Sequence, residues 1–296
     1  MQPISSMEEI GRCEAHFVIL GIPEDYGVRA NQGIAGAAST WEPVLKTLVN
    51  VQSNLFLTGS EIILLGHFEF SAPESDNLEA LSKKVEEIDA LIYPVLQKIF
   101  NAGKVPIVIG DGQNNAYPII KALSLARKKP VDIINIDAHA DLRSTVGRHS
   151  GNAFSCAIRD GLIKNYGIFG LQENYINEAV LIQLQDNPNI NCVYFDELIK
   201  TKDRTTIWPD FSKRFDYHMG LEIDLGAIEN VLSSASSPSG FTLNDMRRLV
   251  LNTKKKLSYL HLCEGAVQMS DGRKDQSTAK TIVYLTTDFI KAQINV

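Results

Sequence analysis

Residues 131–141 of this 296-residue chain read Val-Asp-Ile-Ile-Asn-Ile-Asp-Ala-His-Ala-Asp. Valine and isoleucine dominate the first six positions and fall on both faces, which is typical of a strand buried in a parallel sheet. The next five positions alternate Asp, His and Asp with alanine. Side chains at alternate positions can project into a common space as the chain leaves a strand. The segment therefore predicts a buried strand that ends in a polar site.

Similar short apolar runs recur along the chain and alternate with longer amphipathic segments. Residues 78–100 carry apolar side chains three or four positions apart, which predicts a helix. Thr242 and Asp245 resemble a capping box that opens a helix over 242–256, and a last helix is expected over 278–291. The other predicted strands are residues 17–20, 62–65, 105–109, 166–169, 192–195, 219–223 and 257–262.

This alternation predicts an α/β fold, a three-layer α/β/α sandwich around a central, mainly parallel sheet. Strands separated by helices are joined by right-handed crossovers, which place helices on both faces of the sheet. No linker rich in Pro, Gly or Ser divides the sequence, so we expect one domain over residues 1–296. In such a sheet, ligands bind just beyond the carboxyl ends of the strands.

Composition restricts the classes of function. Hydrophobic residues make up 44% and charged residues 22% of the chain, as in ordinary globular proteins. With 29 basic and 35 acidic residues, no long Lys/Arg run and no apolar run near the ~20 residues of a membrane span, we expect no nucleic-acid partner and no membrane partner. The opening MQPISS resembles no secretory leader, and the four cysteines are scattered, so we expect a reduced, cytoplasmic protein.

Two acidic segments follow separate predicted strands. Asp137, His139 and Asp141 form an oxygen-rich set with one imidazole, which suits manganese, iron or a similar divalent ion. Glu222 and Asp224 follow the second strand. Buried carboxylates that face one another require a cation, so the five side chains predict one metal-binding pocket. The alternatives are that Asp137 caps a turn and that Glu222 and Asp224 end a solvated strand.

The order of these motifs resembles the ureohydrolase superfamily, which includes arginase, agmatinase and formimidoylglutamase. Residues 21–25 and 31–37 look like its G-x-P-x-D and N-x-G-R-x-G-A signatures, with Ile34 replacing the arginine. Residues 137–141 match the central D-A-H-x-D motif. Residues 234–241, Ser-Ala-Ser-Ser-Pro-Ser-Gly-Phe, resemble the S-A-P-x-P-x-G segment of formimidoylglutamase, which is the nearest branch. The resemblance spans nearly the whole chain and implies the same sandwich fold.

The resemblance implies that a hydroxide held between two Mn²⁺ ions attacks a guanidino or formimino carbon. Gln113 stands where the family has a histidine, and its neutral amide is a weaker ligand. Glu222 is one methylene longer than the usual aspartate. The sequence therefore leaves open whether the site binds two metal ions, one ion or none. The implied ligands are Gln113, Asp137, Asp141 and Glu222 for the first ion and Asp137, His139, Glu222 and Asp224 for the second.

The loop after Asp141 corresponds to the part of the family that contacts the rest of the substrate. Phe154 occupies the position of the proton-shuttling histidine of arginases, whereas Arg143 and Arg148 make the loop basic. A guanidinium pairs well with carboxylates, which favours the dicarboxylate N-formimidoyl-L-glutamate over cationic agmatine. The alternative is that both arginines are solvated loop charges. The predicted substrate-binding residues are Arg143, Arg148, His149, Ser150 and Asn152.

The resemblance assigns catalytic roles to Asp141 and Glu264, the latter matching the glutamate that holds the cationic nitrogen of the substrate. It implies hydrolysis of N-formimidoyl-L-glutamate to glutamate and formamide, a step of histidine degradation. The alternative is a degenerate ureohydrolase with weak or no metal binding that binds a ligand or partner. Family members often form trimers or hexamers, so a homo-oligomer is open. His16, His67, His218 and His261 lie outside the matched motifs and are expected to be structural.

Overall fold

The computed structural model describes Met1 and residues 6–296, and within them eight strands form a single parallel sheet. Residues 2–5, which belong to the opening segment MQPISS, lie outside the described residues. Along the sheet, the strand order is β2-β1-β3-β8-β7-β4-β5-β6. The strands are β1 (Phe17–Gly21), β2 (Ile62–His67), β3 (Val105–Ile109), β4 (Val131–Ile136), β5 (Ile163–Leu171), β6 (Ile190–Tyr194), β7 (Gly220–Asp224) and β8 (Tyr259–Cys263).

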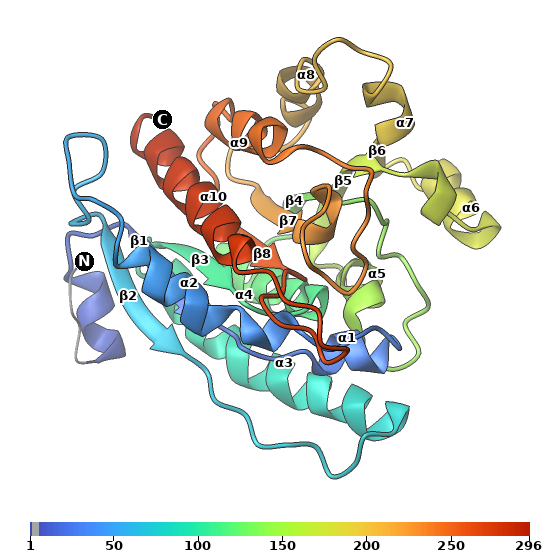
Figure 1. Cartoon of the computed structure of the whole chain (residues 1–296), viewed down its shortest axis with the longest axis horizontal. Coiled ribbons are helices and arrows are strands. Elements are labelled where there is room, and N and C mark those ends of the chain that lie inside the picture. Colours follow the sequence, from blue (N-terminus) through green and yellow to red (C-terminus); the bar gives the residue numbers. More distant parts are fainter. Residues whose placement is uncertain (2–5) are drawn as a thin grey trace.

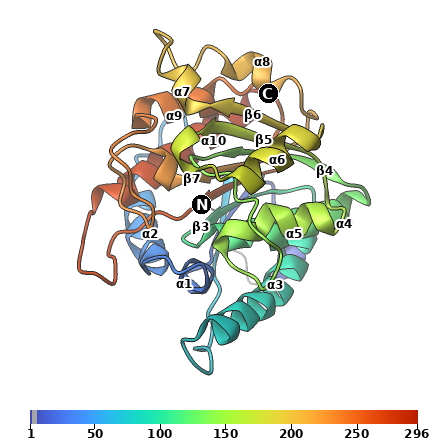
Figure 2. The same ribbon diagram turned by 90° about the vertical axis from the view of Figure 1, so that its right-hand side faces the viewer.

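Helices cover both faces of the sheet (Figures 1 and 2). α2, α8, α9 and α10 bury their apolar side chains with one face, and α3, α4 and α5 bury theirs with the other. The fold is therefore the predicted three-layer α/β/α sandwich. The helices are α1 (Tyr26–Ala30), α2 (Trp41–Leu48), α3 (Leu78–Asn101), α4 (Ala116–Arg127), α5 (Ala153–Arg159), α6 (Glu178–Asp186), α7 (Phe195–Leu198), α8 (Trp208–Ser212), α9 (Leu243–Leu251) and α10 (Ser277–Ile294).

Each predicted strand run contains a strand, but the helix expected over 242–256 ends early. The capping box of Thr242 and Asp245 is formed, and α9 ends at Leu251. Beyond it, the hydroxyl of Thr253 accepts a hydrogen bond from Nε1 of Trp208 at 3.0 Å. The backbone N–H of Leu257 donates to the side chain of Gln293 in α10 at 2.7 Å, which fixes the chain before β8. Tertiary contacts thus override the helix signal. Among the described residues, no helix is both long and apolar enough to span a bilayer.

The sheet order brings the carboxyl ends of β3, β8, β7 and β4 side by side. In β4 and β7, Asn135 pairs with Glu222, and in β7 and β8, Glu222 pairs with His261. Since neighbouring strands are parallel and in register, these three side chains lie in a row on one face of the sheet. Both predicted acidic segments therefore leave the sheet at the same edge.

Gly220, at the start of β7, pairs with Tyr259 of β8. The buried ring of Tyr259 leaves no room for a side chain at position 220. A Cβ at position 220 would lie 2.3 Å from Cε1 of Tyr259. We predict that Gly220→Ala lowers the free energy of unfolding by about 1–3 kcal/mol, the usual cost of overpacking a core. Urea denaturation measures the change. Gly11→Ala is the control, because its Cβ would meet no atom closer than 3.9 Å. Equal losses in both variants would contradict the steric explanation.

Candidate functional site

Three of the predicted metal ligands converge at the carboxyl edge of the sheet. Asp137, His139 and Asp224, here called the ligand triad, offer donor atoms that all lie within 4.8 Å of one another. Asp137 directly follows β4, and Asp224 ends β7. The backbone N–H of His139 donates to Oδ1 of Asp137 at 2.8 Å, which bends the segment so that residues 137 and 139 share one space. Both aspartates are buried, and the His139 side chain keeps 28% exposure, so the group opens toward solvent on one side.

Negative charge is concentrated around the ligand triad. Burial, followed by repulsion from Asp137, raises the pKa of Asp141 and of Asp224 well above the usual range. Burial also raises the pKa of Glu264 to about 7. The pKa of His139 is raised because its hydrogen bond to Asp137 and the nearby carboxylates outweigh the effect of burial. A cation would relieve this repulsion, and a set of two carboxylates and one imidazole fits a divalent ion such as Mn²⁺.

Both predicted catalytic residues have left-handed backbone conformations. Asp141 has φ 49° and Glu264 has φ 62°, which is uncommon for residues other than glycine. At Glu264, the backbone N–H donates to the carbonyl of Asp111 at 2.8 Å, and Oε1 accepts from the backbone N–H of Gln113 at 2.9 Å. The loop after β3 therefore holds Glu264 in place. Such strain persists where surrounding contacts enforce it, as they do at functional sites.

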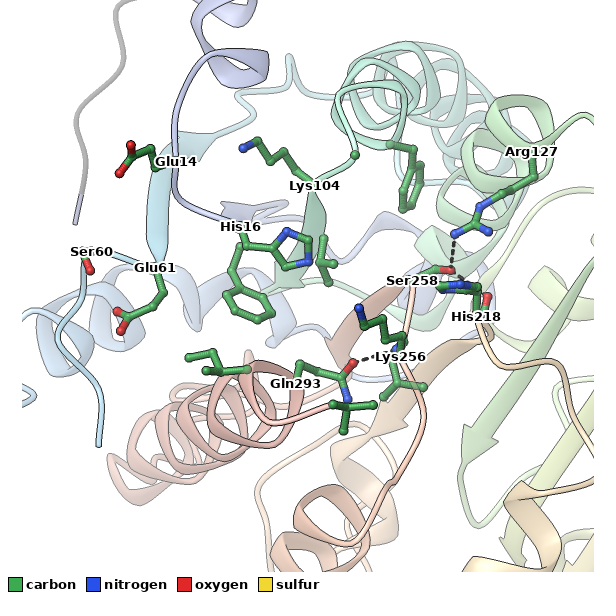
Figure 3. A pocket seen from close by; sticks show the side chains of 17 residues that line it. Glu14, His16, Ser60, Glu61, Lys104, Arg127, His218, Lys256, Ser258 and Gln293 are labelled. Atoms are coloured by element: carbon green, nitrogen blue, oxygen red, sulfur yellow. Dashed lines mark hydrogen bonds between the residues drawn. The ribbon is translucent and has the colours of Figure 1, made fainter. Parts of the chain in front are cut away.

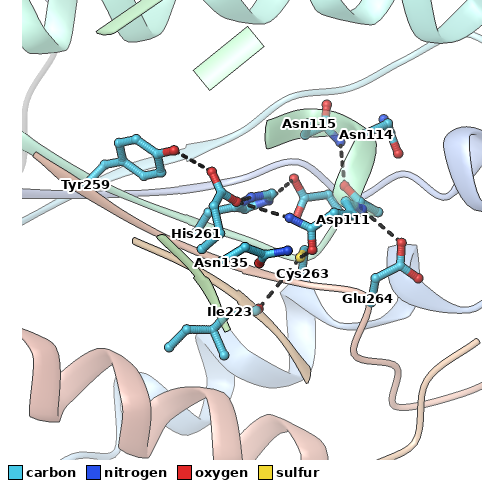
Figure 4. A network of polar contacts seen from close by, with 12 residues as sticks. Asp111, Asn114, Asn115, Asn135, Ile223, Tyr259, His261, Cys263 and Glu264 are labelled. Atoms are coloured by element: carbon cyan, nitrogen blue, oxygen red, sulfur yellow. Dashed lines mark hydrogen bonds and ion pairs between the residues drawn. The ribbon is translucent and has the colours of Figure 1, made fainter. Parts of the chain in front are cut away.

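Gln113 and Glu222 take part in a buried network of polar contacts with three side chains of β8, which Figure 4 labels as Tyr259, His261 and Cys263. One carboxylate oxygen of Glu222 accepts from the Tyr259 hydroxyl at 2.5 Å. The other contacts Nδ1 of His261 and accepts from Nε2 of Gln113 at 3.3 Å. Tyr259 and His261 both lie on β8, the strand paired with β7, so they reach Glu222 directly. The Glu222 carboxylate thus contacts three protein side chains, and its predicted role as a metal ligand stays a prediction.

Arg148 and Asn152 are buried and take part in contacts that hold their loop together. The Arg148 guanidinium donates to Asp89 at 2.9 Å, to the carbonyl of Asn114 at 2.9 Å and to Oδ1 of Asn152 at 2.9 Å. The Asn152 amide donates to two carbonyls of its own loop. The substrate-binding role predicted for both residues stays a prediction.

The other predicted substrate-binding residues lie nearer the rim of the site. The exposed Arg143 donates to Oδ1 of Asn31 at 2.8 Å, and Nδ2 of Asn31 donates to the hydroxyl of Ser150 at 3.2 Å. Burial, together with the neighbouring arginines, lowers the pKa of His149 to about 4, so its ring is neutral at pH 7. Ser150 is buried and His149 is partly buried, so Arg143 is the most exposed member of the predicted set.

Sequence reasoning missed two side chains of the site. The Tyr175 ring stacks on His139 with centroids 4.6 Å apart and is 44% exposed, although nothing in its local sequence marks it. Asp111, which the sequence analysis does not single out, has its carboxylate 2.8 Å from Nε2 of His261. The contact between Asp111 and His261 had a signal in the sequence, because a histidine stands inside the predicted buried strand 257–262.

Comparison with known proteins gives a family match over most of the chain. The model of the Arginase family matches residues 15–288. A formimidoylglutamase of Hahella chejuensis is 31% identical over 182 residues, which are 58% of this chain and 52% of that protein. One of Streptococcus pyogenes is 26% identical over 170 residues, or 55% of this chain and 48% of that protein. The chain thus spans about half the length of these curated relatives.

Solved structures share the fold at low sequence identity. A formiminoglutamase of Trypanosoma cruzi with Mn²⁺ superimposes with TM-score 0.77 and 20% identity, covering 94% of this chain and 93% of that one. The formimidoylglutamase of Bacillus subtilis gives TM-score 0.78 and 14% identity, over 96% and 89% of the two chains. The agmatine ureohydrolase of Thermoplasma volcanium gives TM-score 0.73 and 20% identity, over 98% and 92%.

The buried ion pair between Arg148 and Asp89 predicts different stabilities for two arginine variants of one loop. Arg148→Ala leaves the Asp89 carboxylate buried without its partner, which should cost about 3–5 kcal/mol of unfolding free energy. Arg143→Ala, at an exposed position, should change it by less than about 0.5 kcal/mol. Guanidinium denaturation followed by circular dichroism compares the two. An Arg148→Ala protein as stable as Arg143→Ala would show that the ion pair does not support the loop.

Proposed function

Because the chain belongs to the arginase family, which it matches over residues 15–288, we propose that it is a metal-dependent hydrolase of linear amidines. The proposed substrate is N-formimidoyl-L-glutamate, which water converts to glutamate and formamide. The observation that carries the proposal is the ligand triad, with Asp141 and Glu264 beside it at the same edge of the sheet. The curated relatives named formimidoylglutamase support this substrate over other amidines.

The ligand triad would hold the metal, and a divalent ion such as Mn²⁺ would supply Lewis acidity that lowers the pKa of a nearby water molecule. Asp141, whose pKa burial raises, is suited to accept a proton from the attacking water. Glu264 would pair with the cationic nitrogen of the substrate, and its hydrogen bond from the backbone of Gln113 fixes the direction of its carboxylate. Tyr175 covers one side of the His139 ring and limits the directions from which solvent reaches it.

Arg143 would bind a carboxylate of the substrate. One of its nitrogens is held by Asn31, and the side chain is exposed, so other donors of the guanidinium face solvent at the rim. A fork of parallel N–H donors matches a carboxylate in bidentate fashion. The position therefore supports a substrate whose reacting amidine lies at the ligand triad and whose acidic end lies at the rim.

A degenerate ureohydrolase that binds a ligand or partner without turnover is the second candidate. It is favoured by the commitment of Glu222 to Tyr259 and His261, which removes one carboxylate from the expected ligand set. The neutral amide of Gln113 also favours this candidate, because it is a weaker metal ligand than an imidazole. Turnover separates the two functions, because the binding protein would hydrolyse no amidine substrate, whether or not it retains weak metal binding.

Further parts of the proposal come from sequence alone. We assign the chain to histidine degradation, because that is where the proposed substrate is consumed, and to the cytoplasm, because its four cysteines are scattered. One domain over residues 1–296 and a small-molecule substrate complete the proposal, with a homo-oligomer as an open possibility of the family.

The metal requirement is tested on full-length protein purified without chelators. We predict that it carries Mn²⁺ or a related divalent ion and releases formamide from N-formimidoyl-L-glutamate, but not urea from arginine or agmatine. Dialysis against EDTA should abolish turnover, and Mn²⁺ should restore it. Asp137→Asn should lose the metal, since it removes a charged ligand of the triad. Protein that binds Mn²⁺ yet turns over none of the three substrates would favour the second candidate.

Arg143 is tested by its effect on substrate affinity. Removing a charged hydrogen bond costs about 1.5–3 kcal/mol, so Arg143→Ala should raise KM for N-formimidoyl-L-glutamate by about tenfold or more with a smaller change in kcat. Lys213→Ala is the matched control, because Lys213 forms only a surface ion pair with Asp210. Unchanged kinetics in Arg143→Ala would make this arginine a solvated loop charge.

A further inference from the structure

A cavity lies at the edge of the sheet opposite the ligand triad, and it is here called the amino-edge cavity (Figure 3). Its volume of about 560 Å³ is typical of pockets that hold small organic ligands. Residues that precede or begin β1, β2, β3, β7 and β8 line it. Because β3 has five residues, at about 3.3 Å each, roughly 16 Å of sheet separates this cavity from the ligand triad. It is therefore a separate site.

Three cationic side chains line the amino-edge cavity. Lys104 directly precedes β3, Arg127 ends α4, and Lys256 lies shortly before β8. The sheet order places β3 beside β8, so cations that are far apart in the sequence meet at one edge. Lys104 is half-buried, whereas Arg127 and Lys256 are exposed, so a ligand can reach them from solvent. Among the described residues, no carboxylate forms an ion pair with any of the three.

Hydrogen bonds hold two of these cations in place and leave most of their donors free. The Arg127 guanidinium donates to Oγ of Ser258 at 3.3 Å, and the Ser258 hydroxyl donates to the carbonyl of His218 at 2.7 Å (Figure 3). The Lys104 ammonium donates to the carbonyl of Cys13 at 2.5 Å. A guanidinium has five N–H donors and an ammonium has three, so both groups have donors left for a ligand.

Two histidine rings in the cavity sense the positive charge. Burial, followed by the charges of Lys104 and Lys256, lowers the pKa of His16. Burial, followed by the charge of Arg127, lowers the pKa of His218, and Lys256 adds to this effect. Lys256 thus acts on both rings. An anion between these side chains would relieve the repulsion.

The remaining walls of the amino-edge cavity restrict the kind of anion. Glu14 and Glu61 lie on the side away from Arg127, so negative charge on a ligand belongs at the cationic side (Figure 3). Phe100 and Ile294 add apolar lining, and the volume far exceeds that of one inorganic ion. The cavity therefore suits an organic molecule with a concentrated negative charge.

The number and type of the cations favour phosphate over carboxylate. A phosphate monoester carries close to two negative charges and three acceptor oxygens at neutral pH. An ammonium is a compact point charge that binds phosphate well, and a guanidinium pairs with it in bidentate fashion. A carboxylate carries one charge, which a single guanidinium already satisfies.

We propose that the amino-edge cavity binds a small organic phosphate ester, with its phosphate group on Lys104, Arg127 and Lys256. The organic part of the ester lies against the apolar lining near Phe100. This site requires neither the metal nor the amidine substrate, so it goes beyond the proposed function and does not depend on it.

The test is isothermal titration calorimetry on full-length protein at low ionic strength, because salt screens exposed charges. The probes are phenyl phosphate, benzoate and inorganic phosphate. Phenyl phosphate should bind once per chain and more tightly than either of the others. Benzoate has the same ring with a single charge, and inorganic phosphate lacks the apolar part.

Variants locate the bound phosphate. Lys256→Ala should weaken phenyl phosphate binding by about five- to tenfold, the loss expected for one charged hydrogen bond at an exposed position. Lys104→Ala/Lys256→Ala should weaken it further. Lys254→Ala is the matched control and should bind as the wild type does, because Lys254 is exposed in the same loop but does not line the cavity. Asp137→Asn, at the opposite edge, should also leave binding unchanged.

Failure of phenyl phosphate to bind would overturn the proposal, as would equal losses in Lys256→Ala and Lys254→Ala. Benzoate or inorganic phosphate that binds as tightly as phenyl phosphate would overturn the assignment to an organic phosphate. Binding that is lost in Asp137→Asn and kept in Lys256→Ala would place the anion at the ligand triad and would also contradict the proposal. Protein without metal or turnover would contradict only the proposed hydrolase, so the two ideas fail separately.

Discussion

Repulsion among carboxylates at one edge of the sheet is the constraint on which the rest of the site depends. Asp137, Asp224 and Glu264 are buried together, and the pKa of Asp141 beside them is raised by the same burial and by the charge of Asp137. Such a group is stabilised either by protonation of some of its carboxyl groups or by a compensating cation. The ligand triad offers a place for a metal ion. The neighbouring carboxylates of Asp111 and Glu222 contact the ring of His261.

The two parts of the site therefore compensate charge in different ways. At the solvent side, Asp137, His139 and Asp224 leave donor atoms free to converge on an ion. Deeper in the sheet, Asp111 and Glu222 are paired with His261. The inner contacts are supplied by the protein itself, whereas a metal ion can be exchanged and has open coordination positions. This division assigns reactivity to the outer part and structural support to the inner part.

The loop that follows Asp141 shows the same separation between support and contact. The Arg148 guanidinium donates to Asp89 in α3, to the carbonyl of Asn114 just before α4 and to Asn152, which fixes the loop. Arg143, five residues earlier in the chain, is exposed at the rim. Two arginines that look equivalent in the sequence thus differ in their surroundings, since Arg143 is exposed and Arg148 is buried.

The three-layer architecture and the edge of the sheet where the site lies could both be predicted from the sequence. Apolar runs separated by amphipathic segments specified eight buried strands, because such runs are stable only inside a parallel sheet. The alternation at residues 137–141 located Asp137 and His139 together, because this geometry is local. The contacts that Glu222, Gln113 and Arg148 make could be known only from the folded structure. Their partners, His261, Cys263 and Asp89, lie 39, 150 and 59 residues away, and pairing over such distances depends on strand order and register.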